Sequence, residues 1–157
     1  MFLSYPILAS ILGMLIAQFV KIPIHFLTSR EIKWNLMFST GGMPSSHTST
    51  IISLTTAIGL TSGIYSNEFA IAAVVSLIVM HDATGVRRHA GYHAEVLNKL
   101  LVDFNHLIDT LKDPNLKKAE YREKLKELLG HKPIEVFFGA ITGIIVGVGT
   151  YYFYPFK

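Results

Sequence analysis

The chain has 157 residues, enough for one compact domain, and half of them are hydrophobic while only 16% are charged. With a mean hydropathy of +0.41, it is too apolar for a typical soluble domain, which indicates a membrane protein. The lack of cysteine excludes disulfides and thiolate metal sites. The net charge of +3 is small and the Lys-rich segment also contains Glu, so no nucleic-acid partner is expected.

Four largely apolar stretches predict an all-α fold, an integral membrane helical bundle with about four transmembrane helices in a single domain, 1–157. The first stretch, 2–20, carries no charge and lacks the basic start of a cleaved signal peptide. The segment that follows it, 21–43, is expected to be a loop or a short interfacial helix. The other expected spans are 48–65, 69–86 and 134–153.

The residues between the third and fourth spans, about 90–130, predict a helical insertion. Apolar residues recur there at helical spacing, with polar residues between them. Asp113-Pro114 is expected to end this helix and to start a second one that runs through Leu129. The resulting hairpin lies outside or along the membrane. We favour a solvated insertion without catalytic role, while a lid, a dimer arm or a partner site remain alternatives.

The charges define a topology for the four spans. All Lys and Arg residues except Lys157 fall on one side, and by the positive-inside rule this side is cytoplasmic, with both termini outside. The polar motifs described below lie on the same side. The sequence therefore predicts a multi-pass protein of the cell membrane whose active site faces the cytoplasm.

The segment 41–48, Gly-Gly-Met-Pro-Ser-Ser-His-Thr, is the first candidate site. Ser45 and Ser46 lie where an N-cap is expected, ahead of a long apolar run. The free N–H groups and positive dipole end of such a helix start can bind a phosphate. His47 beside them is suited to move a proton near neutral pH. The alternative is an ordinary capped helix with an incidental histidine.

The end of the third span offers a second cluster. Arg87 and Arg88 can bind a phosphate or anchor the protein to lipid headgroups. Successive helical residues point about 100° apart, so we expect one arginine to face the site and the other to anchor. Asp82 lies inside the membrane boundary, where an acid usually has a partner or a function. We expect it to hold an arginine or a histidine in place, the alternative being that it merely snorkels to the interface.

The start of the fourth span offers a third cluster. If Pro133 opens the helix, Glu135 in its first turn can reach back to the ring of His131. A carboxylate bonded to one ring nitrogen fixes the tautomer and leaves the other nitrogen free as base or nucleophile. Chance pairs of this kind are common. The same span has a close-packing face of glycines spaced by four, namely Gly139, Gly143 and Gly147.

Taken together, these motifs resemble the type-2 phosphatidic acid phosphatases, relatives of the vanadium haloperoxidases. Residues 44–47, Pro-Ser-Ser-His, resemble the family's Pro-Ser-Gly-His motif. Residues 131–135, His-x-x-x-Glu, followed by the spaced glycines, resemble its third motif with Glu in place of Asp. The longer sequences Gly-Gly-Met-Pro-Ser-Ser-His (41–47) and Asp-Ala-x-Gly-Val-Arg-Arg (82–88) resemble the small, divergent bacterial branch of the superfamily. The resemblance covers most of the chain outside about 94–129.

The sequence also departs from the family pattern. Ser46 stands where the family has a glycine. The family's first motif has a lysine followed by an arginine and a proline, and Lys21 with Arg30 matches it only loosely. The family's third motif also has an arginine a handful of residues before its histidine, whereas Arg87 or Arg88, which resembles it, lies some forty residues before His131. His93, six residues after Arg87, has the family's short spacing and is an alternative nucleophile. It lacks both an acid four residues on and the glycine-spaced helix, so His131 is preferred.

The resemblance implies a set of roles. His131 would attack phosphorus and form a phosphohistidine, Glu135 would orient it, and His47 would protonate the leaving alkoxide. No metal and no cofactor are implied. The groups expected to hold the phosphoryl oxygens are Ser45, Ser46, Arg87 or Arg88, and Lys21.

The sequence as a whole therefore predicts a membrane lipid-phosphate phosphatase that hydrolyses a phosphomonoester or diphosphate. Phosphatidylglycerophosphate, phosphatidic acid and polyprenyl phosphates or diphosphates are candidate substrates. The alternatives are a non-catalytic membrane module that binds anionic lipid or a protein partner through residues 89–130, and a vanadate-dependent haloperoxidase. Because four spans are fewer than the family's usual number, a homodimer that packs through the glycine face is also an expectation.

Overall fold

The computed structural model describes residues 4–39, 41–111, 125 and 130–154. Within these residues the fold is all-α, as predicted, with no strand. The elements are α1 (Tyr5–Ser29), the short 3-10 helix η1 (Trp34–Phe38), α2 (Ser46–Ser62), α3 (Asn67–Thr84), α4 (Val86–Leu111) and α5 (Pro133–Phe153).

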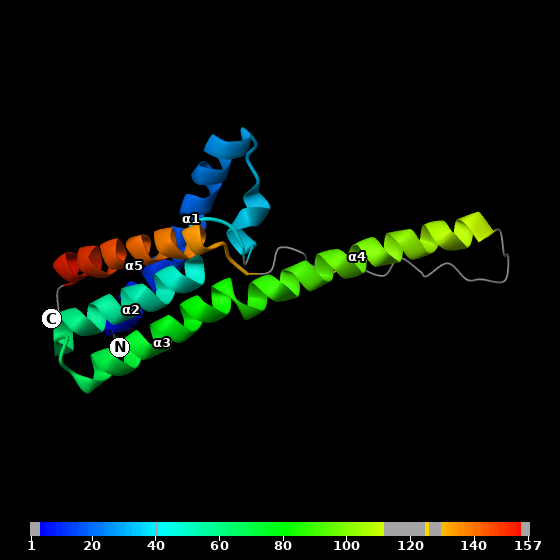
Figure 1. Ribbon diagram of the computed structural model, residues 1–157. Helices are drawn as coiled ribbons and strands as arrows, with labels where there is room; N and C mark the ends of the chain where they lie inside the picture. Colours follow the sequence, from blue (N-terminus) through cyan, green and yellow to red (C-terminus); the bar gives the residue numbers. More distant parts are fainter. Residues whose placement is uncertain (1–3, 40, 112–124, 126–129, 155–157) are drawn as a thin grey trace.

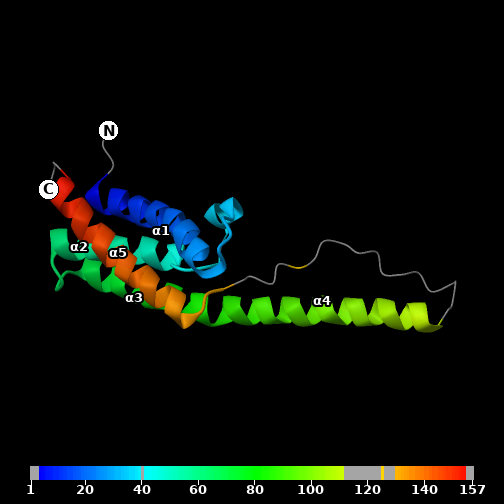
Figure 2. The ribbon, with the colours of Figure 1, turned by 90° about the horizontal axis from the view of Figure 1, so that it is seen from above.

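Helix α2 lies at the centre of the bundle, since it contacts α1, α3 and α5 (Figure 1). The two chain ends lie at the same end of the bundle (Figures 1 and 2). At the opposite end, the start of α2, the end of α3 and the start of α5 come together. Helix α4 continues from α3 and projects away from the bundle (Figure 2).

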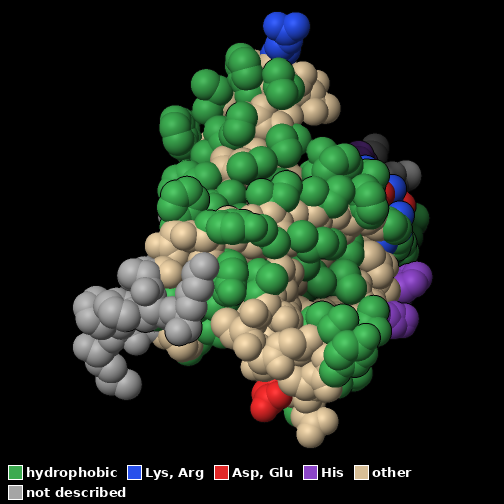
Figure 3. Space-filling model, turned by 90° about the vertical axis from the view of Figure 1, so that its left-hand side faces the viewer, with side chains coloured by type: hydrophobic (Ala, Val, Ile, Leu, Met, Phe, Trp, Pro, Cys, Tyr) green, Lys and Arg blue, Asp and Glu red, His purple; other side chains and the backbone are tan. Residues whose placement is uncertain are grey.

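Among the described residues, three helical runs are long and apolar enough to cross a membrane: α1, the run Asn67–Asp109, which comprises α3 and most of α4, and α5. Helix α2, with 17 residues and many Ser and Thr, is shorter. Hydrophobic side chains cover most of the face shown in Figure 3, with charged side chains near its edges. This surface fits a membrane helical bundle, and the count of four spans stays a prediction.

Two predicted boundaries differ from the structure. Helix α1 continues through 21–29, for which the sequence predicted a loop or interfacial helix, because a lysine does not interrupt a helix and this one is buried. The third span ends at Thr84, and Gly85 separates it from α4, which begins before the expected start of the insertion. The second arm of the expected hairpin, up to Leu129, falls almost entirely outside the described residues.

The spaced glycines of α5 pack against α2. A Cβ on Gly139 would lie 2.6 Å from the carbonyl oxygen of Ser45. A Cβ on Gly143 or Gly147 would lie 2.8 Å from a side-chain atom of α2. The predicted close-packing face is thus occupied within the chain, so it is not free for the homodimer contact that the sequence suggested.

Small polar side chains line the other contacts of α2. Ser49 Oγ donates to the carbonyl of Gly13 in α1 at 2.9 Å, and the hydroxyls of Thr55 and Ser76 lie 2.8 Å apart between α2 and α3. The Ser53 hydroxyl donates to a carbonyl of its own helix at 2.7 Å. Each hydroxyl is satisfied without a bulky side chain, so three helices can approach α2 closely.

Replacing Gly143 with Ala should destabilise the bundle. Its Cβ would press on Ile52 and on the Ser49 carbonyl, and such overpacking costs about 1–3 kcal/mol. A Cβ added to Gly149 on the same helix would meet no atom within 4 Å, so Gly149→Ala is the matched control. Unfolding free energies in detergent measure both, and equal effects of the two changes would contradict this packing.

Candidate active site

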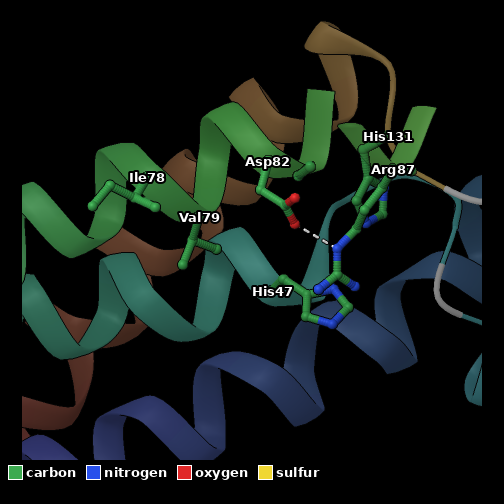
Figure 4. A pocket seen from close by; sticks show the side chains of 8 residues that line it. His47, Ile78, Val79, Asp82, Arg87 and His131 are labelled. Atoms are coloured by element: carbon green, nitrogen blue, oxygen red, sulfur yellow. Dashed lines mark hydrogen bonds and ion pairs between the residues drawn. The ribbon is translucent and has the colours of Figure 1, made fainter. Parts of the chain in front are cut away.

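A cavity of about 330 Å³ opens where the starts of α2 and α4 and the segment before α5 meet the end of α3. Its polar lining brings together residues that lie far apart in the sequence (Figure 4). His47 comes from α2, Asp82 from α3, Arg87 from α4, and His131 from the segment before α5. The remaining lining residues are Ile78, Val79, Ala83 and Gly130.

The His131 ring is held by the carboxylate predicted from its spacing. Its Nδ1 lies 2.9 Å from Glu135 Oε2, and its side chain is only 2% exposed. Pro133 opens α5, which places Glu135 in the first turn. With the Nδ1 proton donated to the carboxylate, Nε2 carries a lone pair. This Nε2 is buried and has no hydrogen-bond partner among the described residues, so it is available to a group in the cavity.

Backbone contacts fix His131 against the junction of α3 and α4. Its N–H donates to the carbonyl of Ala83 at 2.8 Å. The preceding Gly130 has φ +83°, and a Cβ there would collide with the backbone of Arg88. Only glycine combines this left-handed conformation with so close an approach.

His47 is positioned by the cap of α2. Ser45 Oγ accepts from the N–H of Thr48 at 3.3 Å, as the sequence predicted for a capped start. The Ser45 N–H in turn donates to the Glu135 carbonyl at 2.9 Å, which ties the starts of α2 and α5 together. As a result the rings of His47 and His131 lie 6.2 Å apart, centre to centre.

The cavity favours the neutral form of His47. This residue lies just before the expected membrane span 48–65. Burial lowers the pKa of His47, and the nearby charges of Arg87, His131 and Lys21 lower it further, while Asp82 opposes them. His47 therefore releases a proton more readily than an ordinary histidine.

The two neighbouring arginines have different environments. Arg87 lines the cavity, and its Nε donates to Asp82 Oδ2 at 2.5 Å (Figure 4). Arg88 donates instead to the hydroxyl of Tyr92 at 3.0 Å and lies over its ring. Arg87 is therefore the arginine that can meet an anion in the cavity, and Asp82 holds it.

Several candidate residues do not line the cavity. Lys21 is buried, and its Nζ donates to the carbonyl of Ser39 at 2.9 Å. Ser45 and Ser46 are buried, and the Ser45 hydroxyl serves as a cap. His93 is exposed on α4.

Ile78 and Val79 form the apolar wall of the cavity, which the sequence motifs did not indicate. Their spacing of four and three residues before Asp82 is a signal that could have found them. Within the described residues, no group of three or more His, Asp or Glu side chains that could hold a metal ion occurs.

These features define an all-helical membrane protein with two histidines and an arginine around one cavity. The chain belongs to the divergent PAP2 family, which matches residues 2–146. It is similar to the uncharacterized membrane protein YuiD of Bacillus subtilis strain 168, with 49% identity over 152 residues and 96% of each chain covered. No solved structure gives a significant match.

Replacing Arg87 with Gln should weaken binding of inorganic phosphate at least about tenfold, because a hydrogen bond to a charged group contributes about 1.5–3 kcal/mol. Arg88→Gln is the matched control, since Arg88 contacts Tyr92 outside the cavity. Isothermal titration of the purified proteins with phosphate measures both. Stronger dependence on Arg88 would show that the anion lies elsewhere.

Proposed function

We propose that this protein is a membrane phosphatase that hydrolyses a lipid phosphomonoester or diphosphate through a phosphohistidine. The observation that carries the proposal is the buried, unpartnered Nε2 of His131, which shares a cavity with His47 and Arg87 in the described part of the chain. The family relationship and the apolar helices around the cavity support a phosphate carried by a lipid.

In the first step, His131 Nε2 attacks phosphorus and the bond to the leaving oxygen breaks. His47 transfers its proton to that oxygen, so the leaving group departs as a neutral alcohol, or as a phosphate when the substrate is a diphosphate. Glu135 stabilises the positive charge that develops on the His131 ring. Arg87 compensates the charge on the equatorial oxygens, where positioning and electrostatics matter most.

In the second step, a water molecule attacks the phosphohistidine. His47, now neutral, accepts a proton from this water, and the bond between phosphorus and His131 Nε2 breaks. Inorganic phosphate leaves, and both histidines return to their starting protonation. The free N–H groups at the start of α2, near Ser45 and Ser46, would assist in holding the phosphoryl group.

For the membrane topology, we propose that the span 48–65, which begins within α2 just after His47, crosses the membrane and that the site faces the cytoplasm. Along the sequence, all Lys and Arg residues except Lys157 fall on the same side of the four expected spans as His47, Arg87 and His131. The lysine that α1 contributes, Lys21, would support the loop before α2 through its bond to Ser39. Anionic lipid headgroups of the inner leaflet would then have direct access to the site.

Release of phosphate from lipid phosphates should depend on His131. We expect His131→Ala to lower turnover by several orders of magnitude, because it removes the nucleophile. The matched control is His93→Ala, which should keep wild-type turnover, since this histidine lies outside the cavity. The assay uses purified protein in detergent, without added metal, and a panel of phosphatidic acid, phosphatidylglycerophosphate and polyprenyl phosphates.

Loss of turnover in His93→Ala alone would assign the nucleophile to the other histidine. If the wild type releases no phosphate from any of these lipids, the protein is not a lipid phosphatase. Binding of anionic vesicles that survives His131→Ala would then support a non-catalytic binding module.

The lowered pKa of His47 predicts a pH dependence. The free enzyme needs protonated His47 as general acid, so kcat/KM should fall as the pH rises through this pKa, which lies below the ordinary value of a histidine. The fall should be weaker with p-nitrophenyl phosphate, whose leaving group needs no proton. The profile of kcat/KM against pH for both substrates measures this, and identical profiles would contradict the role of His47.

A further inference from the structure

An apolar stripe on α3 leads into the cavity. Ile71, Val75 and Ile78 are spaced by four and three residues, so they share one face of the helix with Asp82. Ile71 and Ile78 are 66% and 62% exposed, and Val75 is 40% exposed. We call the face formed by Ile71, Val75, Ile78 and Val79 the α3 track.

The track is continuous with the cavity because two of its members belong to both. Ile78 and Val79 line the cavity and lie on α3 about one turn before Asp82 (Figure 4). The side of α3 next to the track packs within the bundle instead, since Ala72 and Ser76 are buried. The track is therefore the apolar surface of α3 that is connected to the polar site.

The outer faces of α1 and α5 lack this connection. Helices α1 and α5 also expose large apolar side chains, such as Phe19 and Ile145. None of the cavity-lining residues lies within α1 or α5. Among the described helices, α3 thus supplies the apolar wall of the site.

The polarity of this surface matches that of a lipid phosphate. Two histidines and Arg87 surround the polar end, and Asp82 holds the arginine there. From Asp82 the track extends along α3 for eleven residues to Ile71, a length of about 16 Å along the helix axis at 1.5 Å per residue. An anionic headgroup fits one end and a hydrocarbon chain fits the other.

We propose that the hydrocarbon chain of the substrate lipid lies along the α3 track while its phosphate occupies the cavity. This inference rests on the proposed phosphatase function and specifies which surface binds the apolar part of the substrate. Contact with the chain at Ile78 and Val79 positions the phosphorus opposite His131.

A tryptophan in the track tests the proposal. Ile78→Trp should lower the ratio of kcat/KM for dioleoyl phosphatidic acid to that for p-nitrophenyl phosphate about tenfold, because it displaces the chain and misplaces the reacting atom. Leu77→Trp is the matched control. Leu77 is 64% exposed, like Ile78, but does not line the cavity, so its ratio should equal that of the wild type.

Equal ratios for Ile78→Trp and the wild type, with active enzyme, would overturn the track while leaving the phosphatase function intact. Equal losses in Ile78→Trp and Leu77→Trp would also overturn it, since the effect would then be unrelated to the cavity.

A binding measurement tests whether the lipid chain lies along the α3 track even if no substrate is hydrolysed. A lysophosphatidic acid with a diazirine in its chain should, on illumination, label α3 at Ile71 to Val79 in both the wild type and His131→Ala. Excess dioleoyl phosphatidic acid should reduce this labelling. Labelling spread evenly over the outer faces of α1, α3 and α5 would overturn the proposal, because it is the result expected for bulk lipid.

Discussion

The close approach of α5 to α2 is the constraint on which the rest of the structure depends. Where Gly139 faces the carbonyl of Ser45, no room remains for a side chain. The starts of the two helices are therefore held together, and a backbone hydrogen bond from Ser45 to Glu135 fixes their register. His47 and His131 follow from this arrangement, because each lies within two residues of one of these helix starts.

Local patterns predicted the parts of the site that depend on neighbouring residues. The serine before α2 predicted its cap, and Pro133 with the spacing of His131 and Glu135 predicted the pair that orients the ring. Small residues spaced by four predicted a close helix contact but not its partner, since the same pattern suits a second copy of the chain. The partner within the chain follows only from the complete bundle.

Residues whose role depends on distant backbone could not be placed from the sequence. Lys21 looked like the end of a span, yet it lies within α1 and bonds to the carbonyl of Ser39, eighteen residues later. For the two arginines, helical geometry predicted divergence without showing which one faces the site. Gly85, with φ of −101° and ψ of −97°, interrupts the helical register between α3 and α4, so helical spacing alone could not relate the arginines to the face of Asp82.

The chain leaves the bundle after Arg87 and returns to it at Gly130, where the backbones of Gly130 and Arg88 touch and His131 bonds to Ala83. The two ends of the segment between Arg88 and Gly130 therefore contact each other, so the geometry of the site does not depend on the length of this segment. The separation of Arg87 and His131 along the sequence is thus a poor guide to their separation in space, and a change in the length of the segment between them leaves the contacts that hold the cavity together in place.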